Sequence, residues 1–191
     1  MQTTTLYVIR HGESEGNRFA SDRQVGPDYG PLGSPLTPEG RRQISELAER
    51  LKQVRFDLLI CSDLIRARES AQILSEVLAL SPVTTDKIRE RVEPETTIAG
   101  GKRLNAFLRE TARLHTGKTV AVVCHGAIMR GLLIALGYAS STRELPKGSL
   151  RNAGLIVLET NGEHWHVAET LGVTREPAIN TEEQENPPIS S

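Results

Sequence analysis

The amino-acid sequence predicts an α/β protein, a three-layer α/β/α sandwich with a mostly parallel central sheet. Three short runs, 5–9, 57–61 and 119–124, are apolar almost throughout, which is typical of strands buried on both faces. Helical patterns lie between these runs, and a covered parallel sheet is the simplest architecture for strands that alternate with helices. The 191 residues are enough for one domain with a substantial core.

Helices are expected where apolar residues recur every three or four positions. The expected segments are 37–54, 62–80, 102–115 and 127–137. In the first segment the apolar stripe consists of Ile44, Leu47, Ala48 and Leu51, and Thr37 before a proline is typical of an N-cap. The last segment is apolar nearly all round, which predicts a buried helix that ends at a glycine.

The remaining segments complete the predicted domain. Two further strands are expected at 154–159 and 164–169, and the Gly- and Pro-rich segment 18–36 is expected to form a loop over one edge. We expect a single domain over 1–176 with a short or minimal cap. The polar tail 177–191 contains prolines and is expected to be disordered.

Composition argues against several classes of partner. With 23 basic and 24 acidic side chains the formal net charge is -1, so we expect neither a nucleic acid nor a membrane partner. Two cysteines, Cys61 and Cys124, fit a reducing compartment. The start MQTTT lacks the features of a signal peptide, and no apolar run approaches membrane-spanning length. We therefore expect a cytoplasmic protein.

Each of the three apolar runs ends in a small polar cluster. The clusters are Arg10-His11-Gly12, Cys61-Ser62-Asp63 followed by Arg66, and Cys124-His125-Gly126. Ligands of open α/β sheets bind beyond the carboxyl ends of the strands, where helix N-termini add positive partial charge. Glycine in two of the clusters lets the backbone approach a ligand closely. The clusters together predict a site for a dianionic phosphoryl group.

The residue types suggest how this site would work. A neutral imidazole can attack phosphorus, and flanking cations are expected to lower the pKa of His11 and keep it neutral. Arg10 and Arg66 can donate forked hydrogen bonds to phosphate oxygens, and His125 can donate one more. Cationic side chains can take the place of a metal ion in phosphoryl transfer, so we expect neither a metal nor a cofactor.

Several of these residues have a simpler interpretation when taken alone. Arg66 could form a surface ion pair with Asp63 or Glu69, and His125 could be a hydrogen-bonded core histidine. His164 and His166 have the spacing of a strand-borne metal pair, but the sequence shows no third ligand.

The sequence resembles the histidine phosphatase superfamily, in its phosphoglycerate mutase-like branch. RHGESEGN (10–17) is similar to the nucleophile motif, SPLTPEGRRQ (34–43) to the first-helix signature, SDLIRARESA (62–71) to the second-arginine motif and VVCHGAIMRGLL (122–133) to the second-histidine motif. The motifs occur in family order and, with their spacers, cover most of 5–137. RNAGLIVLE (151–159) resembles the strand that follows.

The resemblance implies a phosphohistidine intermediate on His11 and a glutamate acid/base after the second helix. It also implies a phosphate pocket made of Arg10, Asn17, Arg66 and His125. The segment DKIRERVEPE (86–95) offers Glu90, Glu93 and Glu95 as the acid. In the family an apolar residue lies two positions before the acid, and Ile88 therefore favours Glu90. Such an acid could protonate the leaving oxygen and later activate water.

The same resemblance separates phosphatases from mutases. Mutases of this branch carry Glu-Arg followed by a histidine or similar residue, Tyr and Gly, and then a longer insertion. Here Glu90-Arg91 is followed by Val92-Glu93-Pro94, and Gly100-Gly101 is the only expected flexible element before the third helix. Little material is left for a lid, and Glu93 and Glu95 would repel an acidic substrate. An open site admits water, which favours hydrolysis.

We therefore expect a metal-independent phosphatase that acts on a small phosphorylated substrate. Three alternatives stay open. The first is a phosphoglycerate mutase-type phosphoryl transferase, and the second is a non-catalytic, phosphate-binding regulatory module. The third is a metallophosphatase.

Overall fold

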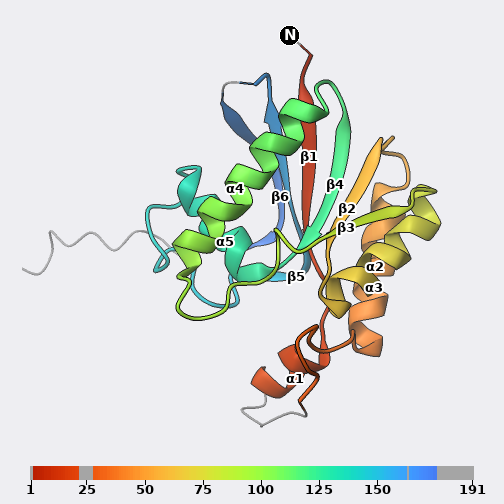
Figure 1. Ribbon diagram of the computed structural model, residues 1–191, viewed down its shortest axis with the longest axis vertical. Helices are drawn as coiled ribbons and strands as arrows, with labels where there is room; N and C mark the ends of the chain where they lie inside the picture. The colour runs from red at the N-terminus through yellow and green to blue at the C-terminus, as the bar shows by residue number, and fades with distance from the viewer. Residues whose placement is uncertain (1, 22–27, 163, 176–191) are drawn as a thin grey trace, which may run out of the picture.

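The computed structural model describes residues 2–21, 28–162 and 164–175, and in this part of the chain a six-stranded sheet lies between two layers of helices (Figure 1). The strands are β1 (Thr4–Arg10), β2 (Leu58–Ser62), β3 (Pro82–Thr85), β4 (Thr119–Cys124), β5 (Leu150–Thr160) and β6 (Trp165–Val173). The helices are α1 (Glu15–Ser21), α2 (Pro38–Leu51), α3 (Ile65–Leu78), α4 (Thr97–Leu114) and α5 (Gly126–Ala135).

The sheet is parallel in its core, and its strand order is β3-β2-β4-β1-β5-β6. The pairs β1–β4, β2–β4 and β2–β3 are parallel. Strand β5 pairs antiparallel with β1 on one side and with β6 on the other. Side chains that alternate along a strand point to opposite faces. Leu6 and Val8 of β1 pack with α4 and α5, while Ile9 packs with α2 and α3. The predicted three-layer α/β/α architecture is confirmed.

The predicted helix signals are confirmed in α2. The Thr37 hydroxyl accepts a hydrogen bond from the amide N of Gly40 at 2.9 Å, which caps the helix. The stripe of Ile44, Leu47, Ala48 and Leu51 is buried against the sheet. Helix α5 is buried as its composition predicted.

Two elements were not expected. Strand β3 is a four-residue edge strand, and Val83 in it is 53% exposed, so it lacks the apolar run of a central strand. Helix α1 occupies the beginning of the segment predicted to be a loop, so that prediction is wrong for residues 18–21.

Helix α4 begins earlier than predicted, because the Thr96 hydroxyl accepts a hydrogen bond from the amide N of Ala99 at 3.1 Å. Gly100 and Gly101 therefore lie inside a helix, and the expectation that they form a flexible element is wrong. A Cβ atom on Gly101 would lie 2.0 Å from the carbonyl carbon of Gly131, and one on Gly131 would lie 2.0 Å from the carbonyl oxygen of Thr97. The glycines thus allow α4 and α5 to pack backbone to backbone.

The antiparallel edge is also longer than predicted. Strand β5 begins at Leu150 instead of 154 and carries an irregular register near Ala153, whose φ of 54° is unusual for a residue with a side chain. Strand β6 continues to Val173 instead of 169. The predicted disordered tail lies outside the described residues. No helix in the described part of the chain has the length and apolar character needed to cross a bilayer.

Replacement of Gly101 by Ala should lower the free energy of unfolding by about 1–3 kcal/mol, because the new methyl group meets backbone atoms that cannot move aside. This net loss is what remains after the gain in helix propensity of alanine over glycine, which is about 1 kcal/mol. Urea unfolding of Gly101→Ala beside Lys102→Ala, an exposed neighbour on α4, measures the effect. A variant as stable as the wild type would show that the helices do not need this close contact.

Candidate active site

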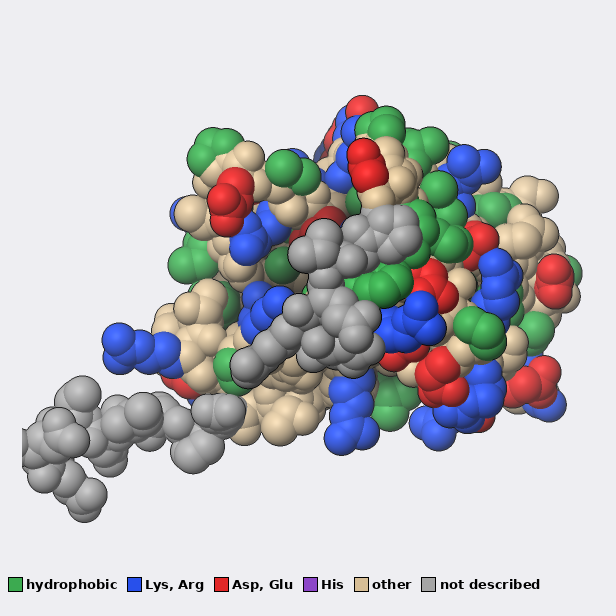
Figure 2. Space-filling view, turned by 90° about the horizontal axis from the view of Figure 1, so that it is seen from below, with side chains coloured by type: hydrophobic (Ala, Val, Ile, Leu, Met, Phe, Trp, Pro, Cys, Tyr) green, Lys and Arg blue, Asp and Glu red, His purple; other side chains and the backbone are tan. Residues whose placement is uncertain are grey.

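His11 and His125 lie side by side because of the strand register. Arg10 pairs with Cys124 in the parallel β1–β4 ladder, so the next residue of each strand leaves the sheet at the same point. The two imidazole centroids are 5.2 Å apart, and the residues are 2% and 0% exposed. They lie at the carboxyl edge of the parallel strands, the lower edge in Figure 1. Figure 2 looks onto this face, on which Lys and Arg side chains are interspersed with Asp and Glu side chains.

The hydrogen bonds of His11 fix its tautomer. Its Nδ1 lies 2.6 Å from the carbonyl oxygen of Gly12, which can only accept, so Nδ1 carries the proton. The other ring nitrogen, Nε2, therefore has a lone pair and accepts a hydrogen bond from Nε of Arg66 at 3.1 Å. A neutral His11 thus directs its nucleophilic atom at a guanidinium group.

Burial and nearby cations keep both histidines neutral. Burial is the larger cause that holds the pKa of His11 well below its ordinary value, and the charges of Arg66 and Arg10 act in the same direction. The pKa of His125 is lowered by burial, then by His11 and the same two arginines. The sequence predicted a neutral His11 from the cations, but removal from water contributes more.

The two arginines point into the site instead of pairing with surface acids. Arg10 donates from Nη1 to the carbonyl oxygen of Leu150, and its buried Nε has no hydrogen-bond partner among the described residues. Burial lowers the pKa of Arg10 to about 10, which leaves it charged at neutral pH. The alternative of a surface ion pair for Arg66 is wrong, because Asp63 pairs with Arg89, and Glu69 with another arginine, Arg41.

Two glycines permit this close packing. A Cβ atom on Gly12 would lie 2.3 Å from the carbonyl oxygen of Gly40, so only glycine lets the loop after His11 pass α2. The amide N of Gly12 donates to Oγ of Ser70 on α3 at 3.2 Å. A Cβ atom on Gly126 would lie 2.9 Å from Nε of Arg10, so this glycine lets Arg10 lie against the beginning of α5.

Asn17 joins the site through a residue that the sequence did not predict. The side-chain amide of Asn152 donates to the carbonyl oxygen of His11 at 3.3 Å and to Oδ1 of Asn17 at 3.1 Å. Asn152 is in the segment 151–159 that resembles a family strand, but nothing in its local sequence marked it as a site residue. Its position depends on the β1–β5 pairing.

His125 makes one hydrogen bond and has one ring nitrogen left. Its Nε2 is 2.9 Å from Oγ of Ser62, which is fully buried at the end of β2. Its Nδ1 has no hydrogen-bond partner among the residues that the structure describes. Two buried nitrogens, one on His125 and one on Arg10, are thus left without a partner in one small region, which is unusual in a folded protein.

Of the three candidate acids, Glu90 lies closest to this cluster. Its carboxylate accepts from the amide N of Ala127, in the first turn of α5, at 3.0 Å and from the amide N of Arg91 at 2.9 Å. Its charge raises the pKa of both Arg10 and Arg66. Glu93 is exposed, and Glu95 is bound by Arg103, whose guanidinium also donates to the carbonyl oxygens of 87 and 89.

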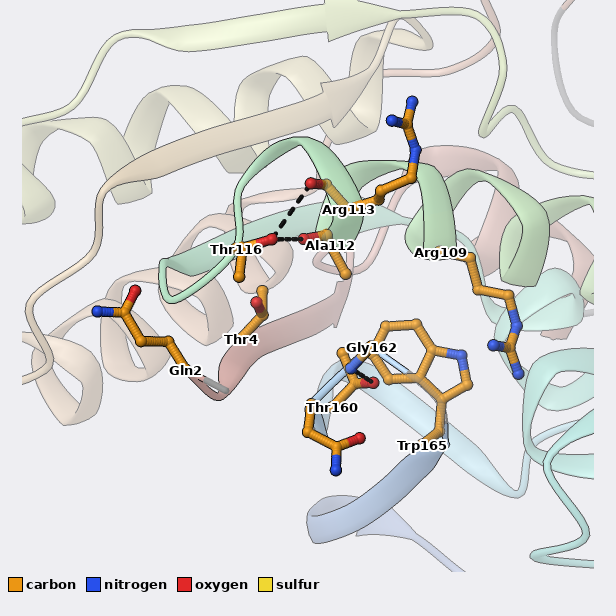
Figure 3. A pocket seen from close by; sticks show the side chains of 10 residues that line it. Gln2, Thr4, Arg109, Ala112, Arg113, Thr116, Thr160, Gly162 and Trp165 are labelled. Atoms are coloured by element: carbon orange, nitrogen blue, oxygen red, sulfur yellow. Dashed lines mark hydrogen bonds between the residues drawn. The ribbon is translucent and has the colours of Figure 1, made fainter.

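A cavity of about 330 Å³ lies at the end of the sheet opposite the histidine cluster (Figure 3). It is bounded by Thr4 at the beginning of β1, Thr160 at the end of β5, and Trp165. None of the predicted site residues lines it, so it is separate from the histidine cluster. Among the described residues no three His, Cys, Asp or Glu side chains form a group that could hold a metal ion, and His164 and His166 are exposed.

The two neutral histidines should make stability depend on pH. Because their pKa values are lowered in the folded state, the unfolded chain binds more protons as the pH falls below about 6.5, and the free energy of unfolding decreases there by about 1.4 kcal/mol per pH unit for each histidine. Urea unfolding between pH 7.5 and 5.5 measures this slope. In His11→Gln the slope should fall by about 1.4 kcal/mol per pH unit, which corresponds to one proton, and in the exposed control His166→Gln it should stay unchanged. Equal slopes in both variants would contradict the assignment.

Comparison with known proteins agrees with this geometry. A sequence model of the Histidine phosphatase superfamily (branch 1) matches residues 6–92 and 91–171. The Bacillus subtilis (strain 168) protein named uncharacterized phosphatase PhoE is 28% identical over 188 residues, which cover 87% of this chain and 93% of PhoE.

Two further relatives differ in how much they share. A probable phosphoglycerate mutase of Klebsiella pneumoniae, GpmB, is 34% identical over 85 residues, which are 44% of this chain and 37% of GpmB. The crystal structure of phosphoserine phosphatase from Entamoeba histolytica in complex with 3-phosphoglyceric acid superposes with a TM-score of 0.71 at 20% identity, covering 87% of this chain and 96% of that one. The family match extends over most of the fold and includes both histidines and both arginines, and the chain belongs to the histidine phosphatase superfamily.

Proposed function

We propose that this chain is a metal-independent phosphatase that hydrolyses phosphomonoesters through a phosphohistidine on His11. The observation that carries the proposal is the lone pair on Nε2 of a buried, neutral His11, which faces Nε of Arg66 at 3.1 Å. Such an atom is a nucleophile next to a group that binds phosphate oxygens.

A phosphoryl dianion would supply acceptor oxygens for the buried nitrogens that have no hydrogen-bond partner among the described residues. The buried Nε of Arg10 and Nδ1 of His125 can each donate to a phosphoryl oxygen if His125 carries its proton on Nδ1. Arg66 would turn its donors from His11 to the same group. We assign Asn17 and the amide N of Gly126, at the beginning of α5, to the edge of this pocket.

The proposed reaction has two steps. First, Nε2 of His11 forms a bond to phosphorus while the ester P–O bond breaks, and Glu90, which takes up a proton from solvent when the anionic substrate binds, gives that proton to the leaving oxygen. Second, water attacks phosphorus, its proton goes to Glu90, and the N–P bond breaks to release inorganic phosphate. The cationic groups stabilise the charge on the phosphoryl oxygens in both steps.

Hydrolysis is favoured over mutase chemistry by the short connection after Glu90. Only residues 91–96 separate this glutamate from α4, and Val92 within them is 78% exposed. So little chain provides no cover that would hold a phosphorylated intermediate away from water. The match to PhoE covers 87% of this chain and 93% of PhoE, whereas the matches to two GpmB proteins cover 37% and 65% of those proteins, which supports the same choice.

His11→Ala should lower phosphate release from phosphomonoesters by at least about a thousandfold, because it removes the nucleophile. The assay is release of inorganic phosphate from a panel of phosphorylated metabolites with EDTA present, with His166→Ala as the exposed control. Activity in His11→Ala would sink the phosphohistidine mechanism, and activity lost to EDTA would indicate a metallophosphatase. Stimulation by a bisphosphate activator would favour the mutase.

Glu90→Gln should lower kcat by about a hundredfold or more with little change in KM, because glutamine can still accept from the amide N of Ala127 but cannot deliver a proton. Glu93→Gln is the matched control, since Glu93 is exposed three residues away. Equal activity of the two variants would remove Glu90 from the reaction. Phosphate binding without turnover in the wild type would favour the non-catalytic binding module.

A further inference from the structure

Ser62 is a buried residue of the site that has no role in the proposed reaction as described so far. It belongs to the polar cluster Cys61-Ser62-Asp63 at the end of β2, and it is fully buried. Cys61 pairs with Val123 in the parallel β2–β4 ladder, so Ser62 lies beside the end of β4 from which His125 emerges. Its Oγ is 2.9 Å from Nε2 of His125.

The hydroxyl proton of Ser62 has a single hydrogen-bond acceptor in the described part of the chain. A serine hydroxyl donates one proton and can also accept through its lone pairs. The other group in hydrogen-bond contact with Oγ is the amide N of Leu64, at 3.4 Å, and an amide N–H can only donate. Oγ therefore accepts from Leu64 and donates to Nε2 of His125.

The direction of this hydrogen bond decides where His125 carries its proton. Burial, and then the neighbouring His11 and arginines, hold the pKa of His125 well below its ordinary value, so the ring is neutral and has one N–H group. With the lone pair on Nε2, that proton is on Nδ1. The opposite tautomer would leave both the Ser62 proton and the Nδ1 lone pair buried without a partner among the described residues, and such unmade hydrogen bonds are costly.

The two histidines thus carry the proton on the same ring nitrogen but leave different atoms for a ligand. In His11, Nδ1–H is bound to the carbonyl oxygen of Gly12, so Nε2 has the lone pair that can attack phosphorus. In His125, Nε2 is bound to Ser62, so Nδ1–H is the group without a partner in the described part of the chain. A lone pair at this position would repel phosphoryl oxygens, whereas an N–H group can donate to them.

We infer that Ser62 is a positioning residue that fixes the tautomer of His125 and thereby makes its Nδ1–H group a hydrogen-bond donor to the phosphoryl group. The inference rests on the proposed function, in which His125 can donate only if its proton is on Nδ1. Ser62 does not contact the reacting atoms and acts through the imidazole. Its hydroxyl is therefore needed to direct a proton and not only to fill space.

NMR of the wild type labelled with ¹⁵N in its histidines reads the tautomer directly, with the signals of His125 assigned by their loss in His125→Gln. We expect a protonated Nδ1 and an unprotonated Nε2. In Ser62→Ala the hydroxyl is absent, and signals of both tautomers should appear. Thr111→Val, which removes a buried hydroxyl from α4, should keep the wild-type pattern. A protonated Nε2 in the wild type, or an unchanged pattern in Ser62→Ala, would overturn the inference.

The effect on the reaction is measured with p-nitrophenyl phosphate as the substrate. Ser62→Ala should lower kcat/KM by about tenfold or more, because a hydrogen bond to a charged group contributes about that factor. Thr111→Val should keep the wild-type value. Equal kcat/KM in the wild type and Ser62→Ala would overturn the inference and leave the phosphatase standing.

Binding of inorganic phosphate, measured by calorimetry, separates this inference from the proposed function. Binding that is about tenfold weaker in Ser62→Ala, without turnover of any phosphomonoester by the wild type, would support the role of Ser62 and contradict the phosphatase. Turnover by a wild type that carries the opposite tautomer of His125 would overturn the role of Ser62 alone.

Discussion

The parallel register of β1 and β4 is the constraint on which the site depends. Arg10 opposite Cys124 makes His11 and His125 leave the sheet together, and their rings then meet at 5.2 Å. A slip of one residue would turn every side chain of β1 to the other face. Leu6 and Val8 would lose α4 and α5, so the apolar core that stabilises the sheet also holds the two histidines in place.

This placement brings together more positive charge and hydrogen-bond donors than the neighbouring described residues balance. Two imidazoles and two guanidinium groups lie together at a buried edge, and the imidazoles respond by staying neutral. The arginines cannot lose their charge at neutral pH, since the pKa of Arg10 falls only to about 10. Glu90 is the acid whose charge raises the pKa of both Arg10 and Arg66. A phosphoryl dianion would supply further negative charge and acceptor oxygens, which is why the same geometry suits phosphate binding.

The sequence was sufficient for the parts of the fold and site that are encoded locally. Apolar runs and polar residues at their ends predicted β1, β2 and β4 and the position of His11. It was insufficient where long-range contacts decide. Strand β3 has no apolar run and exists because β2 offers it an edge. Asn152 reaches His11 only through the pairing of β5, 141 positions away in the chain. Nothing in the sequence distinguished Arg103 from other charged residues on a helix.

Arg103 also explains why Glu90, the proposed acid, was the hardest residue to place from the sequence. Glu90 lies on an irregular segment, so no periodicity fixes where its carboxylate goes. Arg103 on α4 binds the carbonyl oxygens on the N-terminal side of Glu90 and the carboxylate of Glu95 beyond it. Helix α4 is in turn positioned by its glycine contact with α5, the helix whose Ala127 amide holds Glu90. The position of Glu90 is therefore set by how closely two helices pack, and that closeness depends on two glycines, Gly101 and Gly131, that lie outside the segment of Glu90.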